Sequence, residues 1–216
     1  MKRREALALI AAGAASTVIA RALAKGDVPT GVNQVEGLVH VNGEQAHVGT
    51  PVRPGDRVST SQASSAVIVV GSDAFLLRSN TRIELGKSPE GLTSQLRVAA
   101  GGVLSVFSKK PLTIKAATAS IGIRGTGAYL EMQTAGVYFC LCYGEAVFDG
   151  PGMASSRNVK TTHHEEPLLI TDVGGAMRIA PGPFMNHTDA ELAMLEALVG
   201  REPPFTKGGM YPANKY

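Results

Sequence analysis

The feature that most constrains this chain is a succession of short apolar runs separated by glycine and proline turns. The β-branched run Ala66–Val70 is followed by Gly71-Ser72-Asp73, and the chain then resumes with Ala74–Leu77. Asn42-Gly43, between two apolar segments, is a strong signal for a tight β-hairpin. Further strand-like segments lie at 81–85, 94–99, 102–107, 111–116, 119–123 and 127–132. Short strands punctuated in this way, with no helical period, predict an all-β sandwich, barrel or roll.

One helix is predicted, close to the C-terminus. Thr188 is followed three residues later by Glu191, which is the pattern of a capping box. Leucines at helical spacing follow, and Gly200 ends the pattern. These leucines are Leu192, Leu195 and Leu198. We therefore expect one all-β domain over residues 25–180, and a C-terminal helix with an irregular tail over residues 181–216.

The first 24 residues have the three regions of an export signal. Lys2, Arg3 and Arg4 precede an uncharged stretch from Ala6 to Ala20. Small residues then lie where a signal peptidase reads them, so we expect cleavage after Ala24. The signal is twin-arginine-like, because the paired arginines precede a mild apolar core rich in alanine, glycine, serine and threonine.

Export sets the expected location and the charge of the remaining protein. Arg21 interrupts the apolar run before it reaches the roughly 20 residues that a spanning helix needs, so no stable membrane span is expected after cleavage. Residues 1–24 hold four of the 21 basic residues and one of the 18 acidic residues, which leaves 17 of each. A neutral body without a basic cluster argues against nucleic-acid binding. The sequence predicts a periplasmic protein of the bacterial cell envelope.

The stretch from Gly37 to Phe148 resembles a FecR domain, the periplasmic module of bacterial iron-uptake signalling. The resemblance is carried by segments 48–70, 73–85, 96–107, 117–131 and 144–148. Its most specific part is Ile123-Arg124-Gly125-Thr126, which follows an apolar strand. The resemblance implies a β-roll or β-sandwich that acts as a sensing or interaction module in envelope signalling. It would bind a partner protein of the envelope or a small ligand.

The chain departs from the iron-signalling members of this family at its N-terminus. In those proteins a cytoplasmic segment precedes a membrane helix and controls a sigma factor. Only a few residues precede the apolar run here, so no direct sigma-factor contact is expected. Arg124 in the most specific block has two interpretations. It either bonds backbone carbonyls beside a glycine bulge, or it contacts a ligand or partner.

The most distinctive chemistry lies in the segment from Val137 to Gly144. On a strand, Cys140 and Cys142 point to the same face, with Cα atoms roughly 6.5–7 Å apart. That spacing disfavours a disulfide between them, although an oxidising envelope favours disulfides. Two neighbouring free thiols therefore need another explanation.

Three explanations of the two cysteines remain open. They are small buried hydrophobes of a core, or ligands of a metal ion, or thiols with a redox or intermolecular role. In the metal hypothesis Cys140 and Cys142 are joined by His163 or His164, expected on a return strand about twenty residues later. Only one of these adjacent histidines should face the thiols, and zinc, copper or iron are the candidate ions. For His187, which precedes the predicted helix, we expect only a loop or capping role.

The sequence contains no recognisable catalytic set. It lacks the nucleophile elbow Gly-x-Ser-x-Gly, a phosphate-binding glycine loop and the zinc-protease pattern His-Glu-x-x-His. We therefore expect a binding module and not an enzyme. The expected functions are a FecR-type sensing or interaction module, a metal-binding or metal-sensing protein, or a β protein that assembles through its sheet edges.

Overall fold

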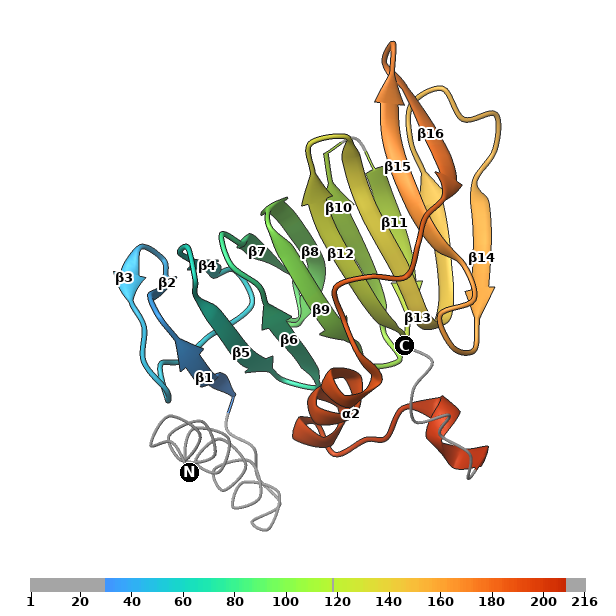
Figure 1. Ribbon diagram of the computed structural model, residues 1–216. Coiled ribbons are helices and arrows are strands. Elements are labelled where there is room, and N and C mark those ends of the chain that lie inside the picture. Colours follow the sequence, from blue (N-terminus) through green and yellow to red (C-terminus); the bar gives the residue numbers. More distant parts are fainter. Residues whose placement is uncertain (1–29, 118, 209–216) are drawn as a thin grey trace, which may run out of the picture.

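The structure of the chain, a computed structural model, describes residues 30–117 and 119–208 (Figure 1). The prediction of an all-β fold with one C-terminal α-helix is confirmed in this part of the chain. The predicted signal segment, with its cleavage after Ala24, lies outside the described residues. None of the helices within them is long and apolar enough to cross a membrane.

Sixteen strands follow one another before the helix. They are β1 (Gly31–Glu36), β2 (Val39–Val41), β3 (Glu44–Gln45), β4 (Arg57–Thr60), β5 (Ser65–Val70), β6 (Asp73–Leu77), β7 (Arg82–Lys87), β8 (Thr93–Ala100), β9 (Gly102–Val106), β10 (Pro111–Ala116), β11 (Ala119–Arg124), β12 (Gly127–Gln133), β13 (Gly136–Asp149), β14 (Arg157–Thr161), β15 (Pro167–Val173) and β16 (Ala176–Pro181). The helix α2 (Asp189–Leu198) and a 3₁₀ turn η1 (Pro204–Gly208) complete the described chain.

The strands form two layers that share one strand. The first layer has the order β1-β5-β6-β9-β12-β13-β15-β16, and all its pairs are antiparallel. The second layer has the order β3-β2-β4-β7-β8-β10-β11-β13-β14, with β8 and β10 parallel. The sheet curls so that the two layers face each other, as Figure 1 shows.

The strand β13 passes from one layer to the other. Its first part pairs with β12 and β15, and its last part, from Gly144, pairs with β14 and then also with β11. The backbone of Gly144 has a φ of 101°, and a Cβ atom at this position would lie 2.6 Å from Cγ2 of Thr126. The passage between layers therefore requires glycine at this position.

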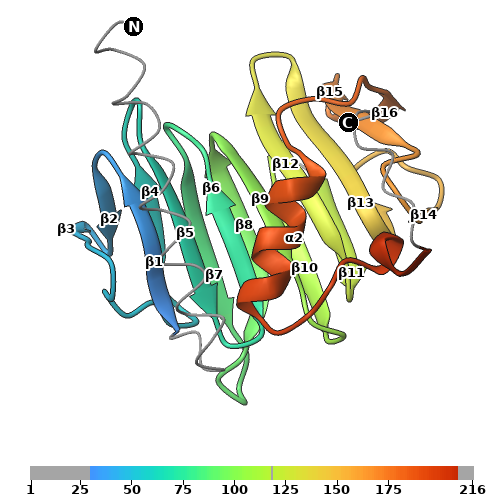
Figure 2. The same ribbon diagram turned by 60° about the horizontal axis from the view of Figure 1, so that its bottom comes forward.

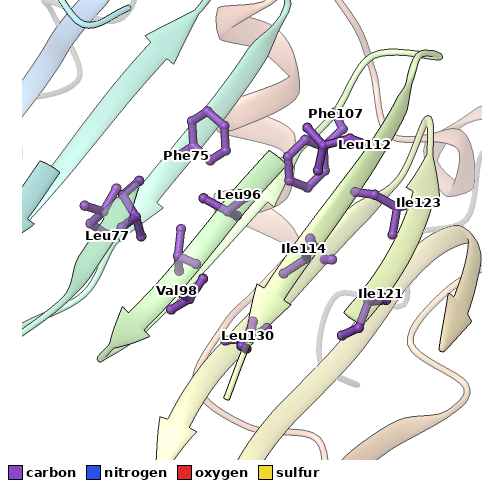
Figure 3. Packing of buried hydrophobic residues seen from close by; sticks show 14 of the residues in the cluster. Phe75, Leu77, Leu96, Val98, Phe107, Leu112, Ile114, Ile121, Ile123 and Leu130 are labelled. Atoms are coloured by element: carbon purple, nitrogen blue, oxygen red, sulfur yellow. The ribbon is translucent and has the colours of Figure 1, made fainter. Parts of the chain in front are cut away.

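The main core fills the space between the two layers. Figure 3 shows side chains of both layers meeting there, with Phe75 against Phe107 at a ring-centroid distance of 5.7 Å. Because side chains alternate along a strand, β13 points Phe139 and Leu141 into this core. Cys140 and Cys142 consequently point to the opposite, outer face of the first layer.

The helix α2 covers that outer face. The strands β5, β6 and β9 are buried on both faces, which explains their continuous apolar sequences. Figure 2 shows α2 lying across the layer over β6 and β9. The predicted capping box of Thr188 and Glu191 is present, and the predicted leucines of α2 are buried in a second apolar cluster.

Replacing Gly144 by alanine should destabilise the fold by about 2–4 kcal/mol, since the new Cβ combines an unfavourable φ with a clash against the side chain of Thr126. Gly43→Ala is the matched control, because Gly43 has a φ of 89° but nothing within 4 Å of a new Cβ. We expect the control to lose about 1–2 kcal/mol. Denaturant unfolding of both variants measures the difference, and equal losses would contradict the account of β13.

Candidate metal centre

Two thiols form one side of the candidate site. Cys140 and Cys142 lie on β13, point to the same face as predicted, and are both 0% exposed. Neither forms a disulfide. They lie in the second apolar cluster, which is bounded by the outer face of the first layer and by α2. Their burial removes them from solvent, while their sulfur atoms face the two histidines described next.

His164 is presented by the loop between β14 and β15. Its backbone N–H donates to the carbonyl of Cys142 at 3.0 Å, and its φ is 56°. Beside it, the Glu165 carboxylate accepts hydrogen bonds from the backbone of Thr162 and His163 and fixes the loop as a tight turn. The predicted return strand is present as β14, but it ends at Thr161, so the two histidines lie in the turn that follows it and not on the strand itself.

His187 comes from the segment that leads into α2. Its ring stacks on Tyr129 at a centroid distance of 4.8 Å and an interplanar angle of 18°. Its Nδ1 lies 2.7 Å from the carbonyl oxygen of Met185. The residue is 3% exposed, and its Nε2 lies 3.3 Å from Nδ1 of His164.

The four donor atoms lie close enough together to surround a single metal ion, and two of the distances between them match the edges of a tetrahedral site. Ligand atoms of Cys140, Cys142, His164 and His187 all lie within 4.8 Å of one another. Zinc–sulfur bonds of about 2.3 Å and zinc–nitrogen bonds of about 2.05 Å give tetrahedral edges of about 3.4 Å between nitrogens and about 3.6 Å between sulfur and nitrogen. The observed edges are 3.3 Å between the two imidazoles and 3.4 Å between Cys140 Sγ and His164 Nδ1.

The hydrogen bonds on the outer side of each ring direct the inner nitrogens toward this centre. Nε2 of His164 lies 3.0 Å from the carboxylate of Asp189, and Nδ1 of His187 faces a carbonyl. Both of these partners only accept hydrogen bonds, so both outer nitrogens carry the proton. In the neutral rings the two inner nitrogens then present lone pairs to each other, an arrangement that a shared cation stabilises.

Asp189 also binds the second histidine of the pair. Nε2 of His163 lies 2.9 Å from its Oδ2, so that one carboxylate orients both His163 and His164. The carboxylate–histidine arrangement is the usual outer partner of a metal-binding imidazole. His163, His164 and Asp189 also form a second group of possible ligands, which shares His164 with the first.

The electrostatics of the site favour positive charge at its centre. The hydrogen bond with the Cys142 thiol is the main cause that lowers the pKa of Cys140. The pKa falls to about 4, although burial acts in the opposite direction. Burial raises the pKa of Cys142 well above its ordinary value. Burial alone would lower the pKa of His164, but Cys140 and Asp189 outweigh it and raise the pKa.

The structure thus brings together three of the four residues named by the metal hypothesis: Cys140, Cys142 and His164. His163 lies one step further out, on Asp189, in agreement with the expectation that one histidine alone faces the thiols. His187 completes the set, and the sequence interpretation missed it by assigning it a loop or capping role. The sequence does contain one signal for His187: it lies directly before a capping box that starts a helix with an apolar face, and such a helix must dock on the sheet.

Arg124 lies elsewhere. Its side chain is exposed, and its Nε donates to the carbonyl of Lys109 at 3.4 Å. Gly125 beside it has a φ of 63°, and its N–H donates to the carbonyl of Ser108. These contacts correspond to the first of the two interpretations, in which the arginine bonds backbone beside a glycine.

Comparisons with known proteins identify no family for this chain. No protein-family model matches it, and no curated protein sequence matches it. Two crystal structures of a protein from Parabacteroides distasonis, described as a "putative anti-sigma factor", are similar to part of this chain, with TM-scores of 0.47 and sequence identities of 12% and 13%. Each match spans 58% of this chain and 59% of the other. A similarity of this size carries no argument about function.

Proposed function

We propose that this protein binds a single zinc ion through Cys140, Cys142, His164 and His187. The observation that carries the proposal is the convergence of these four buried donor atoms within 4.8 Å, with both imidazoles oriented from outside. Buried core cysteines alone would need neither histidine beside them. Two thiolates and two imidazoles are the donor set of many zinc sites.

The geometry favours one small ion over a cluster. In a two-iron cluster the thiolates and the imidazoles bind different iron atoms, which separates sulfur from nitrogen further than the observed 3.4 Å between Cys140 Sγ and His164 Nδ1. Copper(I) shares the preference for thiolates. We favour zinc because a set with two imidazoles, at tetrahedral spacing, suits this ion without any redox partner.

The site is of the closed kind. Four protein ligands fill a tetrahedral shell, and all four residues are buried, at 0–3% exposure. A catalytic zinc site instead keeps one position for water or substrate. This supports a structural or sensing role for the ion, in a binding module and not an enzyme.

For the cellular setting we propose export to the periplasm and a role in envelope sensing or interaction. Two sequence features support it: the twin-arginine-like signal over residues 1–24 and the resemblance of residues 37–148 to FecR domains. Export in the folded state would carry a metal ion that is already bound into the periplasm. An envelope protein or a small ligand is the expected partner.

Metal analysis of the purified protein tests the proposal. The full chain, produced with its own signal and purified from the periplasm, should contain about one zinc per chain by mass spectrometry. The Cys140→Ser/Cys142→Ser variant should contain none, because half of the donor set is lost. His47→Asn, at an exposed histidine outside the site, is the matched control and should keep its metal. A folded protein that is purified without zinc, and that retains none after zinc is added and the excess is removed by dialysis, would overturn the proposal. About one copper ion per chain would confirm a metal site at these residues but show that its ion is copper and not zinc.

The carboxylate behind His164 should matter for affinity. Asp189→Asn preserves the shape of the side chain but removes the charge that orients the imidazole, so zinc affinity should fall about 10–100-fold. Asp172→Asn makes the same exchange in an exposed turn, where Asp172 bonds the backbone of Gly175, and should leave affinity unchanged. Competition titration with a chromogenic chelator measures both. Equal affinities in the two variants would show that Asp189 has no role at the site.

A further inference from the structure

The last part of the described chain forms a strap across the first layer. We call residues 182–208 the C-terminal strap; it contains α2 and η1. The strap buries three leucines against the outer face of β5, β6 and β9. On the layer side this contact is formed mainly by Val67, Val69, Leu76, Leu104 and Val106. Without the strap, this apolar face would lie open to solvent.

Two polar clamps hold the strap without any metal. Arg78 on the first layer binds Glu191 of α2 through two parallel bonds, of 2.7 and 2.8 Å, and also donates to the carbonyl of Asn186 at 2.8 Å. Beyond the other end of α2, Arg201 donates to Glu196 at 2.6 Å and to the carbonyl of Ser72 at 2.7 Å. The Tyr143 hydroxyl also donates to Glu196.

The metal centre lies across the joint between the strap and the rest of the molecule. Cys140 and Cys142 belong to β13, and His164 belongs to the β14–β15 loop. Only His187 comes from the strap, one residue before the N-cap of α2. A metal ion bound to all four residues would therefore cross-link the strap to the sheet at the start of α2.

We propose that zinc binding holds the C-terminal strap on the first layer, so that loss of the ion releases α2 and exposes the apolar outer face of that layer. The inference rests on the proposed function, and it adds a regulatory role to the same site. Its basis is the division of the ligands between the two parts, three on the sheet side and one on the strap.

The size of the effect follows from linkage. Opening of the strap removes His187 from the site, and a form that has lost a ligand binds zinc more weakly. If the open form binds zinc negligibly, zinc lowers the opening equilibrium by a factor of 1 + [Zn]/Kd, which is about 100-fold at free zinc 100 times Kd. The clamps of Arg78 and Arg201 contribute equally with and without zinc, so they change the starting level of opening and not this factor.

Hydrogen exchange on the full-length protein tests the inference, with zinc binding measured separately on the same sample. Amides of α2 should exchange more slowly with zinc at 100 times Kd than with chelator, by up to about 100-fold. Amides of β7 and β8, in the second layer, should change little. Zinc that binds stoichiometrically while α2 exchange stays the same would overturn the inference and leave the proposed function intact. A protein that binds no zinc would overturn both.

Two variants separate the metal from the clamps. Arg78→Gln should speed α2 exchange in chelator, because it removes the paired bonds to Glu191, while zinc should still slow exchange by the same factor. His187→Ala should lose the protection by zinc. If His187→Ala does not fold, the comparison of zinc and chelator in Arg78→Gln decides. A zinc effect that disappears in Arg78→Gln would assign the strap's attachment to the clamp and contradict the inference.

Discussion

The structure depends on a single strand that serves two layers. β13 pairs with β12 and β15 in the first layer and with β11 and β14 in the second, and it turns between them at Gly144. Its alternation sends Phe139 and Leu141 into the core between the layers. The same alternation sends Cys140 and Cys142 outward, just before the turn. The position of the thiols is thus a consequence of the fold's central strand.

The outer face of the first layer imposes the second constraint. Because β5, β6 and β9 are apolar on both sides, their outer face requires a cover, and the leucines of α2 provide it. Docking of α2 carries His187 and Asp189 to the thiols from more than forty residues further along the chain. Covering the sheet and completing the candidate site are therefore one event.

Sequence periodicity predicted most of the fold and half of the site. The turn residues and apolar runs predicted the strands from β5 to β13 and the hairpin at Asn42-Gly43, and the capping box predicted the start of α2, because these signals are local. The common face of Cys140 and Cys142 followed from the period of two along a strand. The contribution of His187 was missed, since it depends on where α2 docks. The sequence also did not show that His164, and not His163, faces the thiols, because this depends on the turn that the Glu165 carboxylate forms.

X-ray absorption spectroscopy at the zinc edge of the zinc-loaded protein tests the central claim most directly, because it reports the ligands themselves. The account predicts two sulfur ligands at about 2.3 Å and two nitrogen ligands at about 2.0–2.1 Å. A shell of nitrogen and oxygen alone would contradict it, because the ion would then lie away from Cys140 and Cys142.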